Sequence, residues 1–96
     1  MDKKFYEFQK ELIVELEAAM EDAAYQLITK EEYQEYLHME KQAAECSNYK
    51  ELLQIAQAYY RSCLLRCTNS ADSYVNRKAT EYYLRKLKEV RRELYV

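Results

Sequence analysis

The residue types best suited to metal chemistry are three cysteines and one histidine. Cys63 and Cys67 lie four residues apart, so on a helix both thiolates could reach one metal ion, and Cys46 and His38 could complete a tetrahedral set. The cysteines, however, lie among apolar residues, where a free thiol packs as a small hydrophobic group. They also lack the tight two-residue spacing that is typical of structural zinc sites. The sequence therefore predicts no metal site.

A second pattern, Glu35-Tyr36-Leu37-His38, matches the Glu-x-x-His spacing of di-iron helical bundles. Such a centre needs two of these motifs, and this chain has one histidine. We also expect Glu35 and His38 to point away from the core. Acid–base or nucleophilic catalysis needs a poised group and a partner that orients it, and no such pair is evident. We therefore expect a protein that is not an enzyme, with no catalytic residues and no cofactor.

Charge is unevenly distributed along the chain, although its net value is only −2. Residues 1–51 carry a balance of −7, and residues 76–96 carry a balance of +4. On a helical wheel, the outer face of the C-terminal segment collects five cations and two tyrosines, which we predict to be partner-binding residues. They are Tyr74, Arg77, Lys78, Arg85, Lys88, Arg92 and Tyr95. The competing interpretation is a solvated face that exchanges ion pairs with the N-terminal helix.

The elements that would position these residues are all helices. The sequence contains no glycine and no proline, the residues that most often form tight turns and stop helices. The remaining composition, rich in Ala, Leu, Glu, Lys, Gln and Arg, favours helix throughout. Thr29 with Glu32, and Asn48 with Glu51, have the spacing of helix N-terminal capping residues. Apolar periodicity and these caps predict helices over about 2–28, 30–46, 49–67 and from 73 to the C-terminus.

The predicted fold is a small antiparallel four-helix bundle, because short connections place successive helices side by side. The alternative is a three-helix bundle, in which a long middle helix runs through Ser47-Asn48. We expect a single domain over residues 1–96. Its third helix should be the most buried, with Ala56, Tyr59 and Cys63 among the least accessible residues, and Ala43 and Ala44 should face inward from the second. Five apolar residues face away from the main apolar stripes and could mark a partner site or second packing surface: Val14, Ala18, Tyr25, Ala58 and Leu65.

The function that these features favour is that of a non-enzymatic protein-interaction module. Small inhibitors, immunity proteins and phage-encoded blockers, which act by covering a partner's surface, have this size and charge. The alternatives are a nucleic-acid-binding or nucleoprotein-associated module that uses the basic C-terminal helix, and a homo-oligomeric scaffold, for which a homodimer would suffice. No apolar run approaches the length of a membrane span, so no membrane partner is expected. The odd cysteine count and the acids in the N-terminal segment favour the cytoplasm over secretion.

Overall fold

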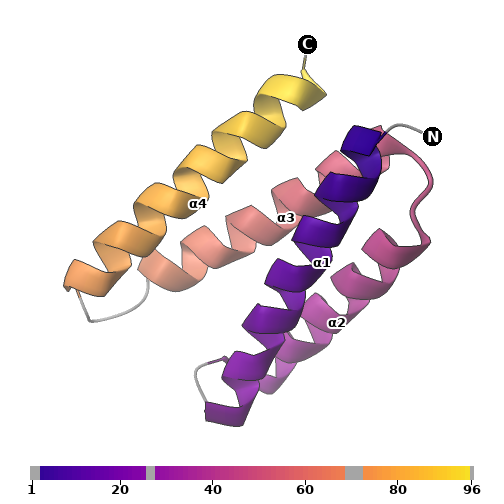
Figure 1. The fold of residues 1–96 in the computed structure, drawn as a ribbon. Helices are drawn as coiled ribbons and strands as arrows, with labels where there is room; N and C mark the ends of the chain where they lie inside the picture. Colours follow the sequence, from indigo (N-terminus) through magenta and orange to yellow (C-terminus); the bar gives the residue numbers. More distant parts are fainter. Residues whose placement is uncertain (1–2, 26–27, 69–72, 96) are drawn as a thin grey trace. The chain divides into compact units, whose positions relative to one another are not determined.

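The structure, a computed structural model, describes the backbone of residues 3–25, 28–68 and 73–95; the side chains of residues 68 and 73–76 are outside the description. Over these residues it contains helices and no β-strand (Figure 1). The elements are α1 (Lys3–Glu21), a 3-10 helix η1 (Asp22–Tyr25), α2 (Lys30–Glu45), α3 (Tyr49–Thr68) and α4 (Ser73–Leu94). The all-α fold with four α-helices is confirmed. Because α2 and α3 are separate, the long middle helix is wrong.

Two helices begin at the caps that the sequence predicts. At α2, the Thr29 hydroxyl accepts a hydrogen bond from the Glu32 backbone N–H at 3.0 Å, and the Glu32 carboxylate accepts one from the Thr29 N–H at 2.7 Å. At α3, the side-chain oxygen of Asn48 accepts from the backbone N–H groups of Lys50 and Glu51. These bonds satisfy N–H groups that have no partner within a helix.

The first helix is shorter than its apolar periodicity predicts. The expected helix over 2–28 ends as an α-helix at Glu21 and tightens into the 3-10 turn η1. The sequence offers no glycine there to form a left-handed C-terminal cap. A 3-10 turn is a common ending in its place, since its hydrogen bonds, which join residues three apart, use carbonyls that would otherwise be unpaired.

The chain divides into two compact units, residues 1–52 and 53–96, with the division inside α3. The single domain expected over 1–96 stays a prediction. In the first unit, α1 packs against α2. Its core includes Phe5, Leu12 and Leu16 of α1 with Tyr36 and Ala43 of α2, all nearly inaccessible to solvent. None of the helices in the described part of the chain is long and apolar enough to cross a membrane.

The side chain of Gln9 joins α1 to the end of α2. Its amide nitrogen donates to the carbonyl oxygen of Ala43 at 2.7 Å, and it lies 3.4 Å from the carbonyl oxygens of Ala44 and Cys46. These carbonyls belong to the last turn of α2, where carbonyl groups lack partners within the helix. A residue of one helix thus caps the C-terminus of another.

We predict that Gln9→Ala lowers the free energy of unfolding by about 1 kcal/mol, because it removes this hydrogen bond and leaves part-buried carbonyls to be satisfied by water. Urea unfolding followed by circular dichroism measures the change. The control is Gln34→Ala, on the exposed side of α2, which should change stability by less than about 0.5 kcal/mol. Equal effects of the two substitutions would show that the cap contributes nothing.

The second unit holds most of α3 and all of α4. Ala56, Tyr59 and Cys63 of α3 are 0%, 2% and 0% exposed, which confirms the predicted position of this helix in the core. Tyr60 is equally buried, and its ring lies 6.3 Å from that of Tyr83 in α4. These contacts bury one face of α4 and leave its other face to solvent.

Candidate functional site

The exposed face of α4 contains the residues that the sequence proposes for partner binding. Leu87 and Val90 are buried and fix which side of the helix faces inward. Six of the seven predicted residues are exposed on the other side: Arg77, Lys78, Arg85, Lys88, Arg92 and Tyr95. The side chain of the seventh, Tyr74, lies outside the described residues.

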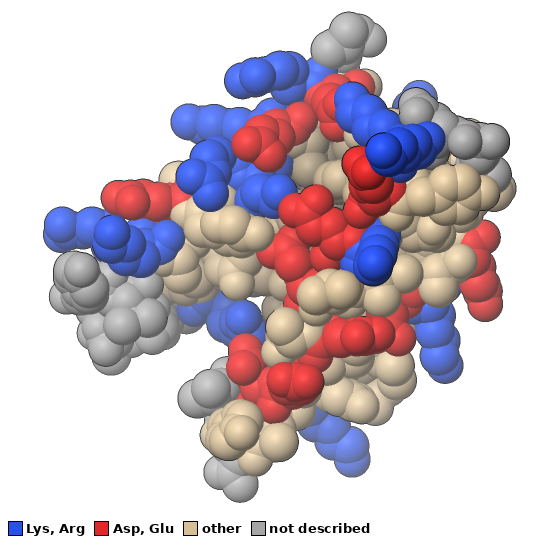
Figure 2. Space-filling model, in the orientation of Figure 1, with Lys and Arg blue, Asp and Glu red and all other residues tan. Residues whose placement is uncertain are grey.

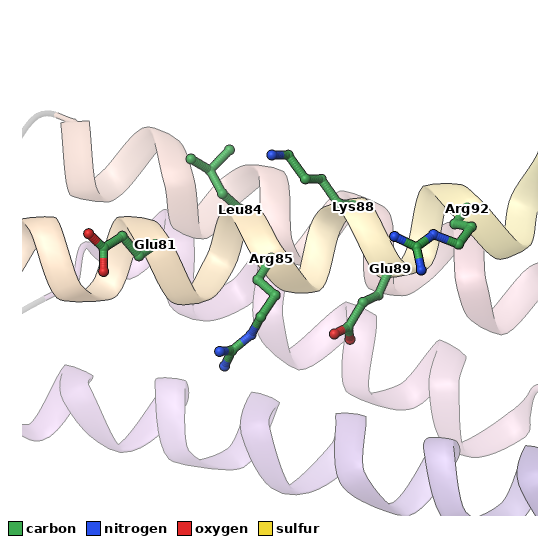
Figure 3. Close-up of a pocket in the computed structure, with 6 residues that line it drawn as sticks. All are labelled: Glu81, Leu84, Arg85, Lys88, Glu89 and Arg92. Carbon is green, nitrogen blue, oxygen red and sulfur yellow. The ribbon is translucent and has the colours of Figure 1, made fainter.

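Three of these cations share a shallow hollow of about 390 Å³ (Figure 3). Leu84 and Lys88 project from one edge of α4, Arg85 and Glu89 from the other, and Glu81 and Arg92 lie toward its two ends. Every lining residue comes from α4, so a further surface is needed to enclose the hollow. The lining residues are Glu81, Leu84, Arg85, Lys88, Glu89 and Arg92.

Glu81, Leu84 and Glu89 are the residues of this hollow that the sequence did not single out. Leu84 is 42% exposed, although it is a large apolar residue. Leu84 lies three residues before Leu87 and six before Val90, so a 3.6-residue period places it at the edge of their apolar stripe, and that edge position is the signal that could have found it.

Two contacts within α4 limit the freedom of the charged side chains. The guanidinium carbon of Arg85 lies 5.6 Å from the centre of the Tyr82 ring, a cation–π geometry. Lys86, with only 16% of its side chain exposed, lies 3.9 Å from the Glu89 carboxylate. The Tyr82 contact therefore partly orders Arg85 before any partner arrives, which lowers the entropy cost of binding.

The two units differ in the sign of their charge. Residues 1–52 contain 13 acidic and 6 basic residues, whereas residues 53–96 contain 4 acidic and 9 basic residues. On the face drawn in Figure 2, Lys and Arg side chains gather along α4, and Asp and Glu side chains dominate the surface of α1. The basic character predicted for the C-terminal helix is thus presented at the surface, where it can act on a partner at a distance.

Comparison with known proteins gives no relative for this chain. No protein-family model, curated protein or solved structure matches it. The function must therefore be argued from the residues themselves.

The residues that could do metal chemistry are divided between the two units, with His38 and Cys46 in residues 1–52 and Cys63 and Cys67 on α3 in residues 53–96. His38 is exposed on α2, as expected, and so is Glu35. The Cys46 thiol donates to the Asn48 carbonyl oxygen at 3.0 Å, in the turn before α3, whereas Cys63 is buried. Within the described residues, no group of three or more His, Cys, Asp or Glu side chains could hold a metal ion.

The phenol of Tyr83 in α4 is shifted far from its usual pKa by its surroundings. Burial raises the pKa of its phenol above the usual value of 10.0, and a hydrogen bond and charge interaction with Cys63 raise that pKa further. Arg66, whose Nη1 is buried, acts in the opposite direction. The phenol is therefore neutral at physiological pH, and it joins α4 to α3 as a structural contact.

This environment predicts a loss of stability in alkali. A phenol whose pKa is higher in the folded than in the unfolded protein stabilises the fold fully below pH 10. Above that pH the unfolded chain releases its proton first, so the free energy of unfolding falls as the pH rises toward the folded value. Urea unfolding of the wild type and Tyr83→Phe across this range measures the effect, and the wild type should lose more stability. Parallel losses in the two proteins would contradict it.

Proposed function

We propose that this chain is a non-enzymatic protein-interaction module that works by covering part of a partner's surface with the exposed face of α4. The observation that carries the proposal is the hollow on α4, whose lining combines Arg85, Lys88 and Arg92 with the exposed Leu84. The hollow is lined by one helix and is open to solvent. Such a site fits the surface of a macromolecule better than a small molecule, because small molecules bind in deep and mostly apolar cavities.

The chemistry of the hollow favours a protein over a nucleic acid. Glu81 and Glu89 lie among the cations, and both carboxylates would repel a phosphate backbone. A protein surface can offer carboxylates to the arginines, donors to the glutamates and an apolar side chain to Leu84. Residues 81, 85, 88 and 92 lie along one face of α4, and all four are charged. The expected partner therefore has a mainly acidic surface with an apolar contact for Leu84.

A non-enzymatic role and a cytoplasmic location belong to the same proposal. Its support is that the single histidine is exposed and that the phenol of Tyr83 is engaged with a buried thiol. The three cysteines are free, which is typical of proteins in a reducing compartment. Blocking a partner, in the manner of small inhibitors and immunity proteins, is the mode of action that this size and surface favour.

The proposal is tested by comparing three baits in a lysate of the source cells. They are the wild type, Arg85→Glu/Arg92→Glu on α4, and Lys30→Glu/Lys41→Glu, which makes the same change of charge at exposed positions of α2. A partner should be retained by the wild type and the α2 variant and lost by the α4 variant. The purified partner should then bind the wild type and the α2 variant with similar affinity and the α4 variant more weakly.

The second candidate, nucleic-acid binding, gives a different result in the same experiment. Its support is the surplus of cations in residues 53–96. In that case wild-type protein would bind DNA or RNA with an affinity that falls steeply with salt. Retention of a protein partner by the α4 variant, or nucleic-acid binding of this kind, would overturn the proposal.

A further inference from the structure

The outer face of α1 carries a row of exposed residues on the side opposite to its core. Lys10, Val14, Glu17 and Glu21 are all exposed and follow one another at steps of four, three and four residues. This spacing keeps them on one side of the helix. Val14 is 56% exposed, which confirms the expectation that it faces away from the apolar stripe of Leu12 and Leu16.

The outer face of α4 has the same steps with the opposite charges. Its exposed row is Glu81, Arg85, Lys88 and Arg92. Two helices whose exposed rows have the same residue spacing can pack side by side, so that each residue of one row lies next to one residue of the other.

The parallel orientation places opposite charges together. When Lys10 is set beside Glu81, Glu17 meets Lys88 and Glu21 meets Arg92, while Val14 falls beside Arg85. The antiparallel orientation of the same rows sets Lys10 against Arg92 and Glu21 against Glu81, two repulsive pairs, and leaves one attractive pair, Glu17 with Arg85. Charge therefore favours the parallel orientation of these two rows.

We propose that the chain self-associates through this match, with α1 of one copy lying parallel to α4 of a second copy. The occupant of the α4 face is then another molecule of this protein. The acidic balance of residues 1–52 and the basic balance of residues 53–96 support the same pairing at longer range, because they attract unlike parts of two copies. The inference depends on charge, spacing and exposure, and it holds whether or not a foreign partner exists.

Self-association would also regulate the proposed function. Lys88 and Arg92 belong both to this interface and to the hollow proposed for a foreign partner. A foreign protein must therefore displace the second copy, and the α4 face becomes free as the protein is diluted or as its interface is screened by salt.

The test is a charge exchange with purified full-length protein. One variant, Glu17→Lys/Glu21→Lys, makes the α1 row basic, and the other, Lys88→Glu/Arg92→Glu, makes the α4 row acidic. Sedimentation velocity over a range of concentrations at low salt should show reversible association of the wild type. Each variant alone should associate at least about tenfold more weakly, because like charges now meet. An equimolar mixture should associate again, since the new cations of one variant face the new carboxylates of the other.

A variant with both rows intact controls for the change of net charge. Glu35→Lys/Glu45→Lys changes the charge by the same amount as the basic α1 variant, at exposed positions of α2, so it should associate as the wild type does. Three results would each overturn the proposal: a monomeric wild type at all concentrations, unchanged association of either row variant, or an equal loss of association in the α2 variant. These outcomes are separate from the bait comparison, since Glu17→Lys/Glu21→Lys should lose self-association and still bind a foreign partner.

Discussion

Tyr60→Ala should lower the free energy of unfolding by about 3–5 kcal/mol, the cost of removing a large aromatic side chain from a core. Tyr60 is 1% exposed, and its ring lies 5.1 Å from that of Tyr59 and 6.3 Å from that of Tyr83. The loss is comparable with the whole stability of a small protein, about 5–15 kcal/mol. Urea unfolding followed by circular dichroism should show a much lower midpoint.

The control for this substitution is the same change at an exposed tyrosine. Tyr95 is 74% exposed, so Tyr95→Ala should alter the free energy of unfolding by no more than about 0.5 kcal/mol. If both variants unfold at the same urea concentration, the Tyr60 ring does not belong to a packed core.

Arg85→Glu/Arg92→Glu should weaken binding to the protein partner by about 2–4 kcal/mol, or about 30-fold to 1000-fold in Kd, if the partner encloses the hollow on α4. Each substitution removes a planar cation able to form two parallel hydrogen bonds with a carboxylate, and adds a repulsive charge. Isothermal titration calorimetry with the purified partner measures the loss. The fold should survive, because both side chains are exposed.

Replacement by lysine separates the geometry of the arginines from their charge. Arg85→Lys/Arg92→Lys keeps both positive charges and removes the two-pronged contact, so we expect an intermediate loss of affinity. A loss below about 1 kcal/mol for the glutamate variant would place these residues at the solvated rim of the interface. In that case the centre of the contact lies elsewhere.

Much of the fold could be predicted because its signals are local. Thr29 with Glu32 and Asn48 each bond to backbone groups within three residues, so sequence spacing alone locates the starts of α2 and α3. The end of α1 depends instead on which hydrogen bonds the carbonyl groups of its last turn form. Apolar periodicity continues past Glu21, so it predicted too long a helix. Ala44 was expected to face inward and is exposed, whereas Ala43 is buried, because adjacent helical residues point about 100° apart.

The candidate site was predictable as a face and not as a hollow. Periodicity places Arg85, Lys88 and Arg92 on the outer side of α4, since it depends only on the helical repeat. That Leu84 and Glu89 share a recess with these cations depends on the side-chain conformations of α4. One-dimensional spacing does not specify those conformations.

The bond from Gln9 to the end of α2 has a consequence for the kinetics of folding. Short connections between successive helices lower the entropy cost of closing the chain and favour fast folding. The Gln9 amide reaches Ala43, 34 residues away, only after both helices have formed and settled into register. The bond therefore belongs to the last events of folding, and its φ-value should be near zero. Gln9→Ala would then leave the refolding rate almost unchanged and accelerate unfolding, so that this side chain lengthens the lifetime of the native first unit without helping it to form.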